Sequence, residues 1–422
     1  MQFLVRKLVL FCLLGMVMHA SAKLSAEDFP AGSPVAERVH FQLAIYYSRT
    51  PKADPLALFR SKLAKLEGAP LLVAKLPEDK SRAYVLAQLE KNVQGNYRPP
   101  DLQSLQYFGR GLSRKQAEDL QGAKQALVLD FVHPKKRILD VLRTASQLIE
   151  DLARESNGLI WDEETREVFT PDEWHARRVE TLRGEFPDVS KQTVIHAYKN
   201  DEFVRAITLG MAKFGLPDVV VEGFSWSSNK SIGTLINLFS QAMAEGAVIT
   251  KAGEFDLVLK SIRNPSVREA QLQTLKPNAA AVAYLGLRKA VPDEGDPQNR
   301  LVQIGFDRYE GVDTHARRDK MISSLFGWED SIVRIKHNEA LLAASQAAKA
   351  KLPALKKDFL AGLRPGEFIQ VKAPFPTPKG GSEWMWVEVS AWKAGSIEGL
   401  LKNEPFDIPT LHAGQMVTVK EN

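Results

Sequence analysis

The sequence has a single cysteine, Cys12, among its 422 residues. It lies within the first 22 residues, so a chain cleaved after Ala22 could form no disulfide and could not bind a metal through cysteine. A cysteine nucleophile is excluded for the same reason. A large exported protein without cysteine fits a bacterial periplasm better than a eukaryotic secretory route.

Long hydrophobic runs are also missing, because no apolar segment reaches the roughly 20 residues that a membrane-spanning helix needs. The longest run, Leu8–Met18, follows two basic residues and precedes small residues that end at Ala22. A basic start, a short apolar core and an Ala-x-Ala-like end are typical of a secretory signal peptide. We therefore expect a signal peptide over residues 1–22, a linker over residues 23–37, and a periplasmic or secreted bacterial protein. We expect no transmembrane segment in the mature chain.

A strong excess of one charge is lacking as well. The chain has 56 Lys and Arg against 51 Asp and Glu, a net charge of +5, and removal of the two signal cations lowers this to +3. Nucleic-acid binding would require a concentrated basic patch, so we expect no nucleic-acid partner. The hydrophobic content of 44% is ordinary for a soluble globular protein.

Recognisable catalytic motifs are absent. There is no phosphate loop, dinucleotide fingerprint, zincin pattern or nucleophile elbow, and Gly223–Ser227 has serine where the elbow needs its second glycine. The histidines are isolated in sequence, so we predict no metal site and no cofactor. The acids Asp162–Glu164 fall in a predicted hairpin turn, which favours solvated side chains. Asp130 and His133, at the end of a predicted strand, are the candidates for catalysis because α/β active sites often lie at strand ends.

Short apolar runs alternate with helix-type periodicity over residues 38–330, which predicts a mixed-sheet α/β region. The clearest elements are a strand over Val39–Tyr47, an amphipathic helix over Ile138–Ala153 and a hairpin over Gly158–Thr170. Thr170 then has the features of a helix N-cap.

A second series of elements follows this pattern. We predict a strand, a helix, a strand and a helix over Gln192–Ala197, Glu202–Phe214, Asp218–Glu222 and Ser231–Glu245. Two similar lobes with a sub-boundary near residue 185 are one interpretation of this repetition.

The chain changes character near residues 328–338, where we place a domain boundary. An Ala-, Leu- and Lys-rich helix over Glu339–Leu363, interrupted at Pro353, precedes four short strands. Residues 337–422 thus predict a small α+β module that folds by itself. The whole chain belongs to the α+β class.

Four segments of this module occur in a characteristic order: Phe368–Phe375, Glu383–Val387, Gly399–Pro405 and Gly414–Val419. The order of a Trp-rich strand, an Asn-x-Pro turn and a final glycine-to-strand turn resembles the YegJ-like bacterial domain of unknown function. That family has no established activity, so the resemblance implies no catalytic residue.

Alternation along Trp384–Trp392 predicts two distinct strand faces. One face would carry Trp384, Trp386, Glu388, Ser390 and Trp392, and the other Met385, Val387, Val389 and Ala391. Three indoles on one face favour a core or an interface. We expect a core packed on the helix around Leu352, Leu355 and Phe359. The alternative is an aromatic platform for a protein, peptide or glycan of the cell envelope, with Glu388 and Lys372 as polar anchors.

The function most consistent with these features is a non-catalytic binding or cell-envelope accessory role. The alternative is a periplasmic hydrolase with its site at strand ends in residues 38–330. A cleft with perturbed acids or histidines would favour the enzyme, and an exposed aromatic patch would favour binding.

Overall fold

The structure is a computed structural model, and it describes residues 27–79, 81–200, 203–327, 339–364, 366–378 and 380–421. The predicted signal peptide and the predicted boundary at 328–338 lie outside these residues, as does part of the predicted linker. Within the described ranges, no helix is long and apolar enough to cross a membrane.

The chain forms two compact units. The first contains Pro34–Val194 and Leu209–Pro217, and the second contains Asp28–Ser33, Ile195–Thr208 and Asp218–Asn422. The first unit contains one sheet and the second contains two, and the chain passes between the units more than once.

The first unit contains a seven-stranded mixed sheet in the order β2-β3-β5-β1-β6-β7-β4. Its strands are β1 (Arg38–Tyr47), β2 (Leu71–Val73), β3 (Tyr84–Glu90), β4 (Gly109–Arg110), β5 (Gln125–Pro134), β6 (Leu159–Asp162) and β7 (Glu167–Phe169). Its helices are α1 (Pro55–Leu63), α2 (Val93–Asn96), α3 (Leu102–Phe108), α4 (Arg114–Gln121), α5 (Ile138–Ser156) and α6 (Pro171–Trp174), with the short turns η2 (His175–Val179) and η5 (Met211–Phe214).

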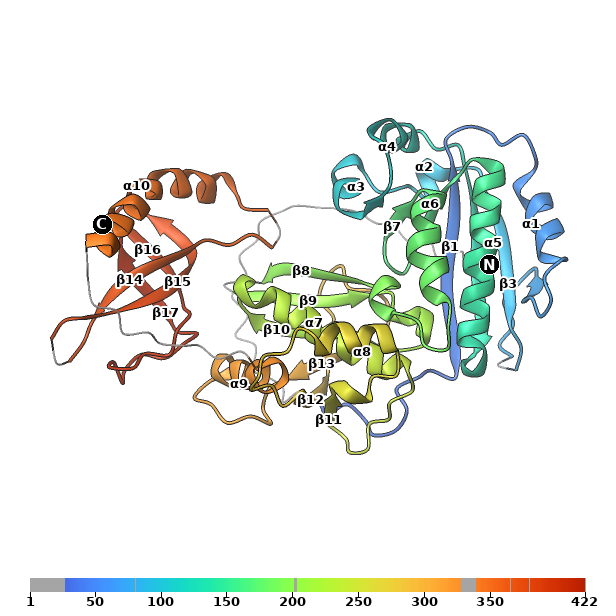
Figure 1. The fold of residues 1–422 in the computed structure, drawn as a ribbon. Helices are drawn as coiled ribbons and strands as arrows, with labels where there is room; N and C mark the ends of the chain where they lie inside the picture. The colour runs from blue at the N-terminus through green and yellow to red at the C-terminus, as the bar shows by residue number, and fades with distance from the viewer. Residues whose placement is uncertain are drawn as a thin grey trace. The chain divides into compact units, whose positions relative to one another are not determined.

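Helices cover both faces of this sheet. The helix α5 runs beside β1 (Figure 1) and contacts β1 and β5. The other face packs against α2, α3 and α4 through a core that includes Val93, Leu105 and Leu120. The helix α5 ends at Asn157, which has left-handed backbone angles, and the next residue, Gly158, lies so close to β1 that an added Cβ would be only 2.2 Å from the Cγ2 of Ile45. Glycine is therefore required at the entry to β6.

The second unit has a six-stranded mixed sheet in the order β11-β12-β13-β10-β9-β8. Its strands are β8 (Val194–Asn200), β9 (Phe203–Leu209), β10 (Asp218–Phe224), β11 (Glu254–Val258), β12 (Val282–Lys289) and β13 (Leu301–Gly305). The accompanying helices are η6 (Trp226–Ser228), α7 (Asn229–Ala244), α8 (Pro265–Leu272) and α9 (Thr314–Phe326).

The helix predicted over Glu202–Phe214 is wrong. The strand β9 occupies most of this segment, and only η5 at its end is helical. Nearly every residue of β9 is buried, so the strand shows no alternation, and its continuous apolar pattern resembles a buried helix.

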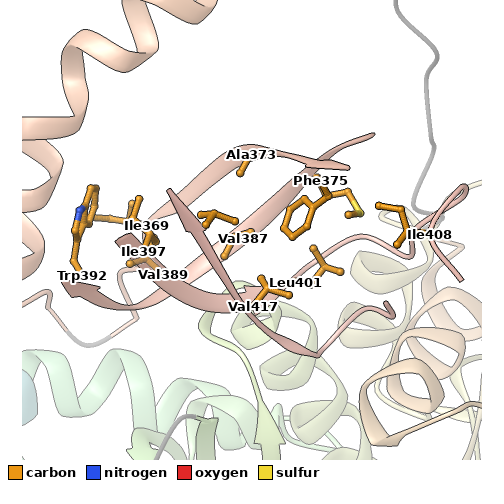
Figure 2. Packing of buried hydrophobic residues seen from close by; sticks show 12 residues of the cluster. Ile369, Ala373, Phe375, Val387, Val389, Trp392, Ile397, Leu401, Ile408 and Val417 are labelled. Carbon is orange, nitrogen blue, oxygen red and sulfur yellow. The ribbon is translucent and has the colours of Figure 1, made fainter. Parts of the chain in front are cut away.

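The C-terminal module (residues 337–422) has an antiparallel sheet in the order β14-β15-β16-β17. It is formed by α10 (Glu339–Ala361), β14 (Gln370–Pro376), β15 (Ser382–Lys393), β16 (Ser396–Leu401) and β17 (Met416–Lys420). Its apolar side chains form a row in Figure 2, with Trp392 at one end and Ile408 at the other. Leu352, Leu355 and Phe359 of α10 pack against this core. The α+β class predicted for the chain is confirmed.

Candidate functional site

The tryptophan strand β15 departs from the predicted alternation because it contains a β-bulge. Its register on β16 shifts between Val389 and Ala391, so Trp392 pairs with the buried Ile397. An extra residue in one strand reverses the faces of all later side chains. Opposite the bulge, Gly399 is required because an added Cβ would lie 2.1 Å from the carbonyl oxygen of Glu388.

The three indoles therefore do not share one environment. Trp392 is 6% exposed and packs in the core beside Phe359, with ring centroids 6.1 Å apart. Trp384 is 39% exposed and Trp386 is 42% exposed. The face that packs on α10 carries Met385, Val387 and Val389, the reverse of the core that we expected.

The two exposed indoles form the centre of what we call the aromatic face, which consists of Lys372, Pro374, Trp384 and Trp386. Lys372 lies opposite Trp386 on the neighbouring strand, and its Nζ stands 5.6 Å from the centre of the indole ring. Pro374 lies opposite Trp384. This face combines large apolar area with one cation.

Glu388, predicted as a polar anchor of this face, is buried. Its carboxylate accepts a hydrogen bond from the backbone N–H of Ser227 at 3.2 Å, and the Nζ of Lys402 lies 4.0 Å away. The other predicted anchor, Lys372, remains on the aromatic face.

Asp130 and His133, predicted together as catalytic candidates, lie on opposite faces of β5 because they are three residues apart on one strand. His133 is fully buried, its Nδ1 lies 3.1 Å from the carbonyl oxygen of Pro134, and burial lowers its pKa. Its position therefore resembles that of a core histidine.

Asp130 instead pairs with His40 of the neighbouring strand β1. Its Oδ1 lies 3.0 Å from the Nε2 of His40 and accepts a hydrogen bond from the Gln42 side chain at 2.9 Å. Tyr97 donates to the other end of the Gln42 amide at 2.7 Å. Sequence reasoning missed His40 and Gln42, although two polar residues at alternate positions of an apolar strand are a signal for a polar patch on one sheet face.

The hairpin β6–β7 holds a buried ionic cluster. Asp162 is fully buried, with the Nζ of Lys213 at 2.6 Å and the Nε of Arg178 at 3.3 Å. Arg178 also donates to Glu167 at 2.5 Å and lies over the ring of Phe169. The sequence had predicted solvated acids in this turn. For Asp162 that prediction is wrong, because two cations from distant segments compensate its burial.

Glu164, in the same turn, has a pKa above its ordinary value. Burial raises the pKa of Glu164 to about 7, and the neighbouring Asp162 carboxylate adds to this effect. Its Oε1 accepts a 3.3 Å hydrogen bond from the backbone N–H of Gln42. A carboxyl group of this kind can hold or release a proton near neutral pH.

Among the residues that the structure describes, no group of three or more His, Cys, Asp or Glu side chains is placed to bind a metal ion.

No curated protein and no solved structure matches this chain. Residues 337–422 match the model of a bacterial family described as "Uncharacterized protein conserved in bacteria (DUF2314)", which confirms the resemblance predicted for the C-terminal module and leaves the rest of the chain unassigned.

Proposed function

We propose that this protein is exported and binds a partner protein of the cell envelope through the aromatic face of its C-terminal module. The observation that supports binding is the exposure of Trp384 and Trp386, at 39% and 42%, on a sheet whose other face is a complete core. Export is supported by the basic, apolar and small-residue order of residues 1–22.

The composition of the aromatic face favours a protein as its ligand over a flat apolar surface. Tryptophan is among the residues that contribute most to binding at protein interfaces. Lys372, held beside Trp386, adds a positive charge at the edge of the apolar area. We therefore expect a partner segment with an apolar side chain next to an acidic one. The backbone edge of β14 is less suited to pairing, because Pro374 and Pro376 cannot donate hydrogen bonds.

The test uses a photoreactive amino acid in place of Pro374, which lies opposite Trp384. Irradiation of intact cells should yield one discrete protein adduct in the envelope. Trp386→Ala should lower its yield more than tenfold, since truncating an interface hot spot costs about 2 kcal/mol or more. The matched control is Leu360→Ala, an exposed apolar residue of α10 in the same module. It should leave the yield unchanged.

Two results would contradict the proposal. Equal yields in the Trp386→Ala and Leu360→Ala variants would show that the aromatic face does not determine capture. An adduct that sediments with the cell-wall glycan and contains no second protein would identify a glycan ligand instead.

A second candidate function, hydrolysis, is favoured by the pair of His40 and Asp130. A carboxylate that accepts a hydrogen bond from Nε2 keeps the hydrogen on that nitrogen, which leaves Nδ1 of His40 as a base. Such a base takes a proton from a water molecule as the water oxygen attacks the carbonyl carbon of an ester. The bond between that carbon and the alkoxy oxygen then breaks, and the proton passes to the departing alcohol.

Hydrolysis of p-nitrophenyl acetate by the whole chain tests this candidate. His40→Ala should reduce the rate at least tenfold, whereas His196→Ala, which removes another exposed histidine, should not. Equal rates in the two variants would exclude it.

A further inference from the structure

The start of the helix pair η6–α7 in the second unit resembles an anion site. The strand β10 leads into Ser225, whose hydroxyl lies 3.0 Å from that of Ser227 and 3.4 Å from that of Ser228. No acidic residue occupies the first turn of α7, which is 16 residues long. The positive end of the helix dipole therefore favours a negative group supplied from outside the helix.

Two cationic side chains stand at the same place. Arg318 is fully buried, and one of its terminal nitrogens donates to the carbonyl oxygen of Gly223 at 2.9 Å. Within the described residues its Nε makes no hydrogen bond, and the nearby Asp319 Oδ1 is 3.7 Å away. Lys402 donates to the hydroxyl of Ser225 at 2.6 Å. The other terminal nitrogen of Arg318 contacts the Nδ1 of His315. A buried guanidinium that keeps an unused donor favours negative charge in its surroundings.

The group present there is the Glu388 carboxylate of the C-terminal module. It accepts the hydrogen bond from the Ser227 N–H and lies 4.0 Å from Lys402. After Asp319 and Asp313, it is the third carboxylate that offsets the charge of Arg318. Glu388 is 6% exposed, although it belongs to the outward face of β15, where Trp386 is 42% exposed. A carboxylate is normally not buried without such partners, because desolvation costs several kcal/mol.

We propose that the η6–α7 N-terminus is a binding site for a small oxyanion, and that Glu388 fills it as an internal ligand that docks the C-terminal module. A free oxyanion such as inorganic phosphate competes with Glu388 for the Ser227 N–H and Lys402, and the positive charge of Arg318 favours it. The contact is therefore a releasable latch, distinct from the aromatic face.

Hydrogen exchange of the full chain, measured by mass spectrometry, tests this contact at the Ser227 N–H, which donates to Glu388. In Glu388→Ala, which removes the acceptor, the peptide that contains Ser227 should exchange at least tenfold faster than in the unaltered protein. Inorganic phosphate should restore its protection, whereas chloride at equal ionic strength should not. The matched control is Glu398→Ala on the adjacent strand β16, where the carboxylate accepts a hydrogen bond from Lys393 instead. This control should leave the Ser227 peptide unchanged.

Three results would overturn the proposal. Unchanged exchange in Glu388→Ala would show that the carboxylate does not hold the site. Faster exchange in both alanine variants would assign the effect to the fold of the module. Fast exchange in Glu388→Ala that phosphate does not slow would show that the site does not bind oxyanions.

Discussion

Trp392 and Trp386 stand only six residues apart on β15, yet their replacement by alanine should have very different effects. Trp392 is 6% exposed and contacts the α10 side chains Phe359 and Lys356. Truncation of a buried aromatic residue to alanine costs about 3–5 kcal/mol. Trp386 is 42% exposed, so its loss removes mainly the cation–π contact with Lys372, worth about 0.5–1 kcal/mol at an exposed site.

The loss of about 3–5 kcal/mol that we expect for Trp392→Ala is a substantial part of the free energy of unfolding of the module. At about 0.05–0.15 kcal/mol per residue, a domain of this size has roughly 4–13 kcal/mol of stability in total. Trp392→Ala should therefore leave the module partly or largely unfolded, whereas Trp386→Ala should leave it folded.

Urea titration of the full chain, followed by hydrogen exchange in peptides of β14 to β17, measures this difference without depending on tryptophan fluorescence. Protection of these peptides should disappear at a much lower urea concentration in Trp392→Ala than in Trp386→Ala. A loss of protection in Trp386→Ala equal to that in Trp392→Ala would refute the bulge-based assignment and would support a core formed by all three indoles.

Three further predictions concern the first unit and the amino terminus. Because the folded protein raises the pKa of Glu164 to about 7, it binds a proton more tightly than the unfolded chain does, and stability should fall as the pH rises from about 4.5 to 7. Glu164→Gln should flatten that dependence in thermal melts at several pH values, and an unchanged slope would contradict the assignment. Lys213→Ala should destabilise the first unit by about 3–5 kcal/mol in urea titrations, because it leaves Asp162 buried without its closest cation. Lys65→Ala, on the surface of the same unit, should have no such effect. Amino-terminal sequencing of protein from the envelope should begin at Lys23, and an intact Met1 would exclude cleavage after Ala22.

Much of the fold could be predicted where local pattern and tertiary environment agree. The helix α5 was predicted from Ile138 because its apolar side chains recur at helical spacing and face the sheet. Thr170 caps α6 as predicted, with its hydroxyl accepting from the Glu173 N–H at 3.4 Å. The strand β9 was missed because a strand buried on both faces loses the alternation that identifies strands.

In the candidate sites, too, some features follow from the local sequence and others depend on the tertiary structure. From the sequence alone came the aromatic character of β15, the relation of residues 337–422 to a bacterial family, and Asp130 as a polar residue within an apolar strand. Only the tertiary structure decided that Trp392 turns inward, since one extra residue in a ladder reverses every later side chain. It also decided that Asp130 pairs with His40, 90 residues away, because partners across a sheet are set by strand order and register. The burial of Asp162 and Glu388 likewise depends on cations and N–H donors that the chain brings from distant segments, and no local pattern encodes that convergence.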